Sequence, residues 1–243
     1  GIPRDAIGMV IAGSSRPGLS SPADACHIAA GLGMEVPAFD MNSACTSMWI
    51  ALYMLSNMRP ESLPDYVLVV APESLTTTVD YDNRSASVLW GDCTAAAIVS
   101  TRVPSRIEIL DNTLESSPAG YEKVIVPLFG HFNQEGRTVQ MFAIKKTVRC
   151  LGKIQETFPS SGRRLNFVGH QANLNIIKAG MENLGLPMEK TFTNLHKYGN
   201  TAGASVPIAL REARDEGLIE SGDLVVTVAF GGGLAWGANA IIW

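Results

Sequence analysis

The sequence predicts an α/β protein in which helices cover the sheets and the chain consists of two related halves. Two observations predict this class. Short runs such as Tyr66–Ala71 are apolar at almost every position, as in strands that are buried on both faces, and they alternate with segments of helical spacing. The chain also aligns with itself without a gap, which indicates that a strand-helix unit has been duplicated.

The internal repeat has a constant spacing. Asn42–Cys45 aligns with Asn200–Gly203, a difference of 200 − 42 = 158 residues. The same difference pairs the apolar run that begins at Ile7 with the run that begins at Leu165. We therefore expect the halves to pack as layers about a pseudo-twofold axis, with the turns at Cys45 and Asn200 facing one another near it.

The repeat divides the chain into an N-terminal half, residues 1–104, and a C-terminal half, residues 105–243. The second half has about sixty residues, Arg106 to Leu165, before the strand that the halves share, whereas the first half has only six before Ile7. The symmetry therefore predicts a strand and a helix upstream of Gly1 that this chain lacks. On this interpretation the chain is a fragment, a processed product or one piece of a larger polypeptide.

The elements follow from apolar spacing and from the residues that end each run. Short apolar runs predict strands at Ile7–Ala12, Val36–Met41, Tyr66–Ala71, Ala95–Val99, Ile107–Leu110, Leu165–Gly169, Leu224–Ala229 and Ala238–Trp243. Helical spacing predicts helices at Pro22–Leu32, Thr46–Leu55, Val139–Phe158, Asn173–Leu184 and Ala204–Glu216. Residues 13–22, 73–87 and 111–137 are expected to be mostly loop.

The composition indicates a soluble globular protein with a sizeable core, since 46% of the 243 residues are apolar. The 19 Lys and Arg residues against 23 Asp and Glu give a net charge of −4, which argues against a nucleic-acid surface. No apolar run approaches the roughly 18–20 residues of a membrane span, and Gly1–Val10 does not resemble a signal peptide. Neither a membrane nor a nucleic acid is therefore an expected partner.

The four cysteines are far apart and form no C-x-x-C pair, so that neither a metal site nor a disulfide framework is indicated. A reducing cytoplasm is the expected compartment. Cys26, Cys93 and Cys150 lie in apolar or helical patterns, and we interpret them as packing residues.

Cys45 differs from the other three because it stands between a predicted strand and a predicted helix. A thiol at such a turn lies near the positive end of a helix dipole, which favours the thiolate and makes the residue a competent nucleophile. The alternative is a small buried apolar cysteine without chemistry.

Two further residues could act with Cys45. His170 directly follows a predicted strand, at the edge of the sheet where open α/β sheets bind ligands, although it could be an ordinary loop histidine. Asn200 stands three residues before the repeat counterpart of Cys45 and could equally be a turn or capping residue. The combination of Cys, His and Asn at strand-to-helix turns is more specific than any one of them.

Four segments resemble the β-ketoacyl-(acyl carrier protein) synthase III family of the thiolase superfamily. They are Asn42–Cys45 (NSAC), Gly169–Leu174 (GHQANL), Tyr198–Pro207 (YGNTAGASVP) and Phe230–Gly237 (FGGGLAWG), with Trp90–Asp92 (WGD) as a further family-like segment. The resemblance runs along the whole chain, but the opening strand-helix portion of the family is absent. It implies a thiolase-like, duplicated α/β/α/β/α layered fold.

The resemblance also implies a reaction. Cys45 would hold an acyl group as a thioester, with the backbone N–H groups of Cys45 and Gly232 as the oxyanion hole. A malonyl thioester would then lose CO2 while His170 Nε2 and the Asn200 amide donate hydrogen bonds to the enolate oxygen. The carbanion would attack the Cys45 thioester in a decarboxylative Claisen condensation of fatty-acid or polyketide biosynthesis.

The resemblance implies that Arg84, Asn173 and Phe230 contact the substrate, with Arg84 against the adenine of coenzyme A. Acyl-CoA and acyl carrier protein would be the partners, with no cofactor or metal, and the chain would form a homodimer. Asn175 departs from the basic residue often found at its position, and the small polar loop Pro17–Pro22 suggests an unusual or larger primer.

Two other functions stay open at this point. Cys45 and His170 could transfer an acyl group to an oxygen or nitrogen acceptor without decarboxylation. Alternatively, the chain could be a non-catalytic partner subunit. A second cysteine near the C-terminus, expected of thiolases proper, is absent from Phe230–Trp243.

Overall fold

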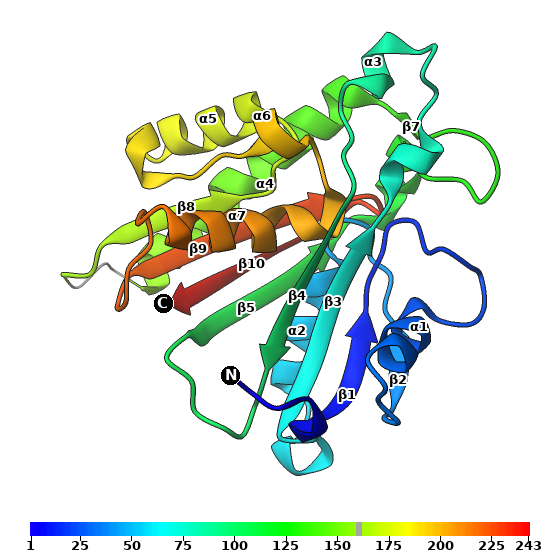
Figure 1. Ribbon diagram of the computed structural model, residues 1–243. Coiled ribbons are helices and arrows are strands. Elements are labelled where there is room, and N and C mark those ends of the chain that lie inside the picture. Colours follow the sequence, from blue (N-terminus) through cyan, green and yellow to red (C-terminus); the bar gives the residue numbers. More distant parts are fainter. Residues whose placement is uncertain (159–161) are drawn as a thin grey trace.

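The computed structural model describes residues 1–158 and 162–243, which form two four-stranded sheets with helices between and outside them (Figure 1). The first sheet has the order β2-β1-β3-β4, and the second has the order β5-β10-β9-β8. The predicted layered α/β architecture with two related halves is confirmed. The predicted domain boundary at residues 104 and 105 falls between β4 and β5.

The first sheet is mostly parallel. Its strands are β1 (Ile7–Ala12), β2 (Ala38–Asp40), β3 (Tyr66–Glu73) and β4 (Cys93–Val99). β1 pairs in parallel with both β2 and β3, whereas β4 pairs with β3 in the antiparallel sense. The parallel strands end at the same edge, so that the residues that follow β1, β2 and β3 come together there.

The second sheet repeats this arrangement. Its strands are β5 (Glu108–Ser116), β8 (Leu165–Gly169), β9 (Leu224–Gly231) and β10 (Ala235–Ile242). β8 and β9 are parallel, and β10 is antiparallel to both β9 and β5. A separate small ladder joins β6 (Val124–Ile125) to β7 (Asn133–Gln134).

The helices complete five layers. They are α1 (Asp24–Gly31), α2 (Ser47–Asn57), α3 (Arg84–Ser87), α4 (Gly136–Thr157), α5 (Leu174–Asn183), α6 (Leu195–Tyr198) and α7 (Ser205–Asp215). Short 3₁₀ turns lie at Arg4–Ala6, Pro60–Ser62, Leu75–Thr78, Pro118–Lys123, Met188–Lys190 and Ala202–Ala204. α1 packs on the outer face of the first sheet, and α4 and α5 pack on the outer face of the second.

The middle layer consists of α2 and α7, which share one apolar core with both sheets. Trp49 on α2 and Val206 on α7 belong to the same buried cluster as Val69 of β3 and Val225 of β9. Because this core takes side chains from both halves, the two sheets are held in one body by burial of apolar surface.

The backbone follows the sequence repeat closely. α2 and α7 start and end 158 residues apart (205 − 47 and 215 − 57), as do β3 and β9 (224 − 66 and 231 − 73). Ala44 and Ala202, also 158 apart, both have a positive φ, of 47° and 46°. Two residues before each alanine stands an asparagine whose Oδ1 accepts a hydrogen bond of 2.9 Å from the alanine N–H, Asn42 in one half and Asn200 in the other. The duplication is therefore conserved down to the backbone conformation of the two turns.

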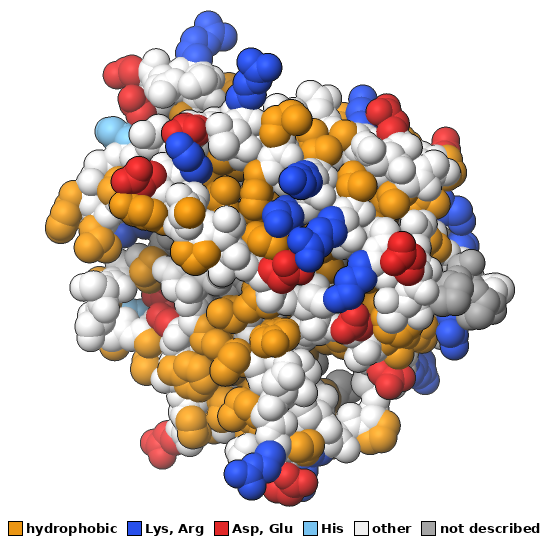
Figure 2. Space-filling view, turned by 180° about the vertical axis from the view of Figure 1, so that it is seen from behind, with side chains coloured by type: hydrophobic (Ala, Val, Ile, Leu, Met, Phe, Trp, Pro, Cys, Tyr) orange, Lys and Arg blue, Asp and Glu red, His pale blue; other side chains and the backbone are white. Residues whose placement is uncertain are grey.

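The halves differ at their edges. In the second half the counterpart of β2 is helical and forms part of α6. Among the described residues, β5 has no counterpart beside β4, where Ile98 is exposed. Figure 2 shows hydrophobic side chains gathered on the lower part of the back face, and α2 and β5, which pack together, expose Met54, Ile109 and Leu110.

Some predicted bounds were wrong. β5 extends to Ser116, beyond the predicted end at Leu110, because it is an edge strand whose polar residues hide the apolar pattern. The segment 73–87, predicted as a loop, contains a 3₁₀ turn and α3. Cys150 is buried as predicted, but Cys26 is exposed, and all four cysteines are free thiols. No helix of the described residues is long and apolar enough to cross a membrane.

A backbone junction between the halves positions the Asn200 turn. The Asn200 N–H donates to the Leu89 carbonyl oxygen at 2.8 Å, and the Gly91 N–H donates to the Asn200 carbonyl oxygen at 3.1 Å. A Cβ built on Gly91 would overlap the carbonyl oxygen of Tyr198. Only glycine therefore fits at residue 91 in this arrangement.

Replacing Gly91 by Ala should lower the free energy of unfolding by about 1–3 kcal/mol, because the added methyl group overpacks a backbone contact. Urea denaturation measures the change. Gly152→Ala is the matched control, since a Cβ there meets nothing within 4 Å and Ala is favoured over Gly inside α4 by up to about 1 kcal/mol. Equal effects of the two substitutions would contradict the junction.

Candidate functional site

Cys45 lies in the turn between β2 and α2, which the strained residue Ala44 and the Asn42 side chain shape. The residue is 8% exposed and packs in a small cluster with Leu75 and Ala202. The turn therefore delivers the thiol to the contact between the two halves rather than to an open surface.

The protonation of the thiol differs from the prediction. Burial, and then the negative charge of Glu73, raise the pKa of Cys45 to about 12, whereas the Ser15 hydroxyl and the backbone lower it. The expected helix-dipole effect is thus outweighed, because the free-energy cost of removing the thiolate from water is larger than its stabilisation by the first turn of α2. The resting residue is a neutral thiol at neutral pH and needs a proton acceptor before it can act as a nucleophile.

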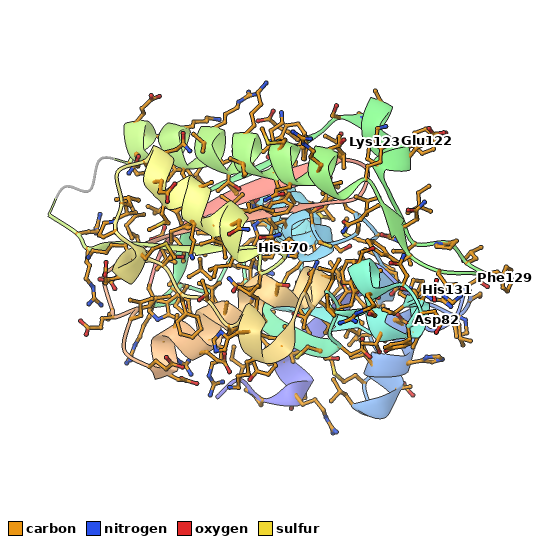
Figure 3. All side chains as sticks on the ribbon, turned by 90° about the horizontal axis from the view of Figure 1, so that it is seen from above. Asp82, Glu122, Lys123, Phe129, His131 and His170 are labelled. Atoms are coloured by element: carbon orange, nitrogen blue, oxygen red, sulfur yellow. The ribbon has the colours of Figure 1, made fainter. Side chains whose placement is uncertain are left out.

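His170 directly follows β8 and lies in the interior of the molecule, as Figure 3 shows. Its backbone N–H donates to the Val228 carbonyl oxygen at 2.8 Å, and its ring packs edge to face on Phe230 with centroids 4.9 Å apart. The residue is 2% exposed, and burial lowers its pKa to about 4. The imidazole is therefore neutral at neutral pH and can donate one hydrogen bond.

Asn200 is buried at the turn that is equivalent to the Cys45 turn. Because its Oδ1 accepts the Ala202 N–H, the amide NH2 is the part of the side chain that remains to donate to a ligand. The turn interpretation of Asn200 is thus correct for the oxygen, and the nitrogen remains available.

The structure brings the three residues together through two short links. Ala202, two residues after Asn200, packs against Cys45. Gly231 also touches Cys45, since a Cβ built on it would lie 2.9 Å from Cys45 N. The residue before Gly231 is Phe230, which carries the ring that packs on His170. Cys45 is therefore linked to the Asn200 turn by a direct contact with Ala202, and to His170 through the consecutive residues Gly231 and Phe230.

The other predicted site residues have varied positions. Gly232 is half-buried, and a Cβ built on it would lie 3.6 Å from Ala44 Cβ, beside the Cys45 turn. Asn173 caps α5, where its Oδ1 accepts the Asn175 N–H at 2.8 Å. Arg84 is exposed at the start of α3. Phe230 is buried in the core and touches the site through the His170 ring.

Sequence reasoning missed Gly231 and Glu73. Gly231 faces the Cys45 N–H without a side chain, and Glu73 is a buried carboxylate coupled to the thiol. The signal that could have found them is the repeat itself, because 231 − 73 = 158 makes the two residues counterparts in the two halves. Glu73 instead looked like the first polar residue of a loop.

Replacing Gly231 by Ala should close access to the thiol, because the added Cβ would lie 2.9 Å from Cys45 N and 3.1 Å from Cys45 Cβ. We expect alkylation of Cys45 by iodoacetamide to slow by about tenfold or more, equivalent to about 1.4 kcal/mol of steric cost. Peptide mass spectrometry measures the rate, with the exposed Cys26 as an internal control whose rate should not change. An unchanged rate at Cys45 would show that Gly231 does not limit this space.

Comparison with known proteins identifies relatives along the whole chain. Residues 39–118 match the family model described as 3-oxoacyl-[acyl-carrier-protein (ACP)] synthase III, and residues 166–243 match the model of its C-terminal portion. The chain is 35% identical to a β-ketoacyl-[acyl-carrier-protein] synthase III of Aquifex aeolicus over 95% of this chain and 75% of the relative.

Solved structures agree. A β-ketoacyl-[acyl carrier protein] synthase III of Thermus thermophilus is 32% identical, with a TM-score of 0.90 over 98% of this chain and 78% of that one. The priming β-ketosynthase of the R1128 polyketide pathway is 26% identical, with a TM-score of 0.83 over 98% and 75% of the two chains.

Proposed function

Because this chain belongs to the 3-oxoacyl-[acyl-carrier-protein] synthase III family, we propose that it joins an acyl group to a malonyl thioester with loss of CO2. The product is a β-ketoacyl thioester of fatty-acid or polyketide biosynthesis. The observation that supports this most strongly is the contact of the Cys45 turn with the Asn200 turn in a thiolase-like fold, together with a neutral buried His170 and the free amide of Asn200.

In the first step the Cys45 sulfur attacks the carbonyl carbon of an acyl thioester, and the acyl group moves to the sulfur as the carrier thiol leaves. The oxygen that becomes negative is held by the N–H groups of Cys45 and Gly232. The contact of Gly231 with Cys45 supports this role, since a residue without a side chain leaves the Cys45 N–H uncovered.

In the second step CO2 leaves the malonyl thioester, and His170 and Asn200 donate hydrogen bonds to the enolate oxygen. The low pKa of His170 supports a neutral donor. Its Nδ1 is buried without a partner among the described residues. Because a buried N–H without an acceptor is rarer than an unused acceptor, this favours the tautomer with the proton on Nε2, the nitrogen that the reaction requires.

The proposed substrates are thioesters of coenzyme A and of acyl carrier protein, in a reaction that needs no metal or organic cofactor. Arg84 is free to meet a nucleotide because it is exposed. Asn173 stands three residues after His170, and Phe230 packs on the His170 ring. Four free thiols suit a reducing compartment, and we propose the cytoplasm.

The experiment that tests the function separates its two steps. The chain is incubated with acetyl-, butyryl- or octanoyl-CoA and then with a malonyl carrier thioester. We expect an acyl adduct on Cys45 by mass spectrometry and release of CO2. His170→Ala should keep the adduct but slow CO2 release by about 10²-fold or more, since it removes a donor to the developing charge.

The matched control is His27→Ala, which removes an exposed histidine of α1 and should leave both steps unchanged. An adduct without CO2 release in the wild type would indicate simple acyl transfer. Absence of any adduct on Cys45 would indicate a non-catalytic partner subunit, and either result would overturn the proposal.

We also propose a homodimer formed through β2. This strand pairs only with β1 among the described residues, so that its outer edge is open, and Phe39 on it is 42% exposed. An open edge strand with an apolar side chain is a ready site for pairing with a second copy.

Phe39→Asp should therefore convert a dimer into a monomer, because it places a charge at the centre of the paired edges. Light scattering coupled to size-exclusion chromatography measures the mass. Met141→Asp is the control, as Met141 is exposed on α4, which covers the other sheet. A dimer that survives Phe39→Asp at micromolar concentration would place the interface elsewhere.

A further inference from the structure

A buried carboxylate beside the nucleophile has no part in the reaction described so far. Glu73 is the last residue of β3 and is 3% exposed. Its Oε1 accepts the Gly203 N–H at 2.9 Å and the Ser15 hydroxyl at 3.2 Å. Its Oε2 accepts the Ser15 N–H at 2.9 Å and the Ser14 hydroxyl at 3.3 Å. These contacts join the loop after β1 in the first half to the Asn200 turn of the second half.

The repeat explains why the carboxylate lies there. Gly203 is the counterpart of Cys45 (203 − 45 = 158), and Glu73 is the counterpart of Gly231. In one half the turn N–H is therefore covered by a carboxylate, and in the other half it faces a glycine. The carboxylate is held by the Gly203 N–H of the other turn and is close enough to raise the pKa of the thiol.

Ser15 connects the two groups. Its hydroxyl donates to Glu73 Oε1 at 3.2 Å and lies close enough to the Cys45 side chain to lower the pKa of the thiol. Burial raises the pKa of Glu73 to about 7, whereas burial lowers that of His170 to about 4. Near neutral pH, Glu73 is therefore better suited than His170 to hold a proton that leaves the thiol.

Three other side chains that carry charge or titrate lie on the elements around Glu73. Cys45 is on the turn between β2 and α2. Cys93 on β4 is the register partner of Glu73, and Arg16 follows Ser15 in the loop after β1. Burial raises the pKa of Cys93 above its usual value. A titration near pH 7 at this place therefore belongs to the Glu73 and Cys45 pair.

We propose that Glu73 accepts the proton of the Cys45 thiol through the Ser15 hydroxyl. This inference rests on the proposed function for the acylation step. The S–H bond of Cys45 breaks as its proton passes to Ser15 Oγ, and the Ser15 hydroxyl proton passes to Glu73 Oε1. The products are a thiolate, an unchanged serine and a neutral carboxylic acid. One negative charge moves from Glu73 to sulfur, and two charges never stand side by side. The carrier leaves as its own thiolate and takes a proton from solvent, so that Glu73 stays protonated. When condensation releases the Cys45 thiolate again, the same transfer runs backwards.

The first test uses iodoacetamide, which does not depend on the proposed function. In the coupled pair the thiolate population rises with pH until Glu73 has lost its proton, stays level, and then rises again. The rate of Cys45 alkylation in the wild type should therefore show an inflection near pH 7, and Glu73→Gln should lose it. An inflection that persists in Glu73→Gln would overturn the relay.

The second test compares two serines that both contact the carboxylate. Ser15→Ala breaks the connection to Cys45 and should slow acylation by the best of the three acyl-CoAs by about tenfold or more, a modest share of the usual effect of a general base. Ser14→Ala removes a hydroxyl that bonds to Glu73 and to the Arg16 N–H but is not part of the connection. It should stay within about threefold of the wild type.

Equal acylation rates in Ser15→Ala and Ser14→Ala would overturn the relay. If Glu73→Gln does not fold, the comparison of these two variants tests the relay in its place. If no acyl-CoA loads the wild type, the proposed function fails, and the alkylation profile still decides for or against Glu73.

A stability measurement checks that Glu73 titrates near pH 7, which the relay requires. A carboxyl whose pKa rises from 4.5 to about 7 on folding stabilises the protein below pH 4.5 and loses that contribution as pH rises through about 7. The unfolding free energy of the wild type relative to Glu73→Gln should therefore fall between pH 4.5 and 7. A difference that does not change with pH would mean that Glu73 does not titrate there.

Discussion

The site depends on one backbone constraint, the left-handed conformation of an alanine in each of two equivalent turns. A residue other than glycine in this conformation costs about 1–3 kcal/mol, and both Ala44 and Ala202 adopt it. The cost is offset locally by the Asn42 and Asn200 side chains, which accept the alanine N–H groups, and globally by burial of α2 and α7 between the sheets. The result is that both turns have one backbone conformation, which fixes the position of Cys45 in the first half and of Asn200 in the second.

Once the two turns share a backbone, their chemistry is decided by side chains alone. Cys45 stands where the second half has Gly203, His170 stands where the first half has Ala12, and Glu73 stands where the second half has Gly231. Each of these three groups therefore has a small residue as its counterpart in the other copy. A duplicated unit with the same groups in both halves would leave no room at the axis for a substrate, so the divergence of the repeat is what opens the site.

The sequence predicted the arrangement of the two halves better than it predicted the protonation states in the site. The gapless repeat predicted the equivalence of the turns, because a helix and the turn before it are local structures, and similar local sequences adopt similar conformations. The bounds of β5 could not be read in the same way, since an edge strand tolerates polar residues. The pKa of Cys45 was predicted in the wrong direction because burial is a tertiary property. Glu73 was missed for the same reason, as nothing in its neighbours in sequence indicates that the other half encloses it.

The electrostatics of the site are those of a region that tolerates a single negative charge. The imidazole of His170 is neutral, and the four hydrogen bonds to Glu73 stabilise one carboxylate against the cost of its burial. A second anion nearby would lack comparable donors, and the raised pKa of Cys45 expresses that cost. When the sulfur becomes acylated, the proposed relay leaves Glu73 neutral, so that the negative charge of the enolate develops beside an uncharged acid. The proton stored on the carboxylate thus lets the same buried region stabilise first a thiolate and then an enolate without ever holding both.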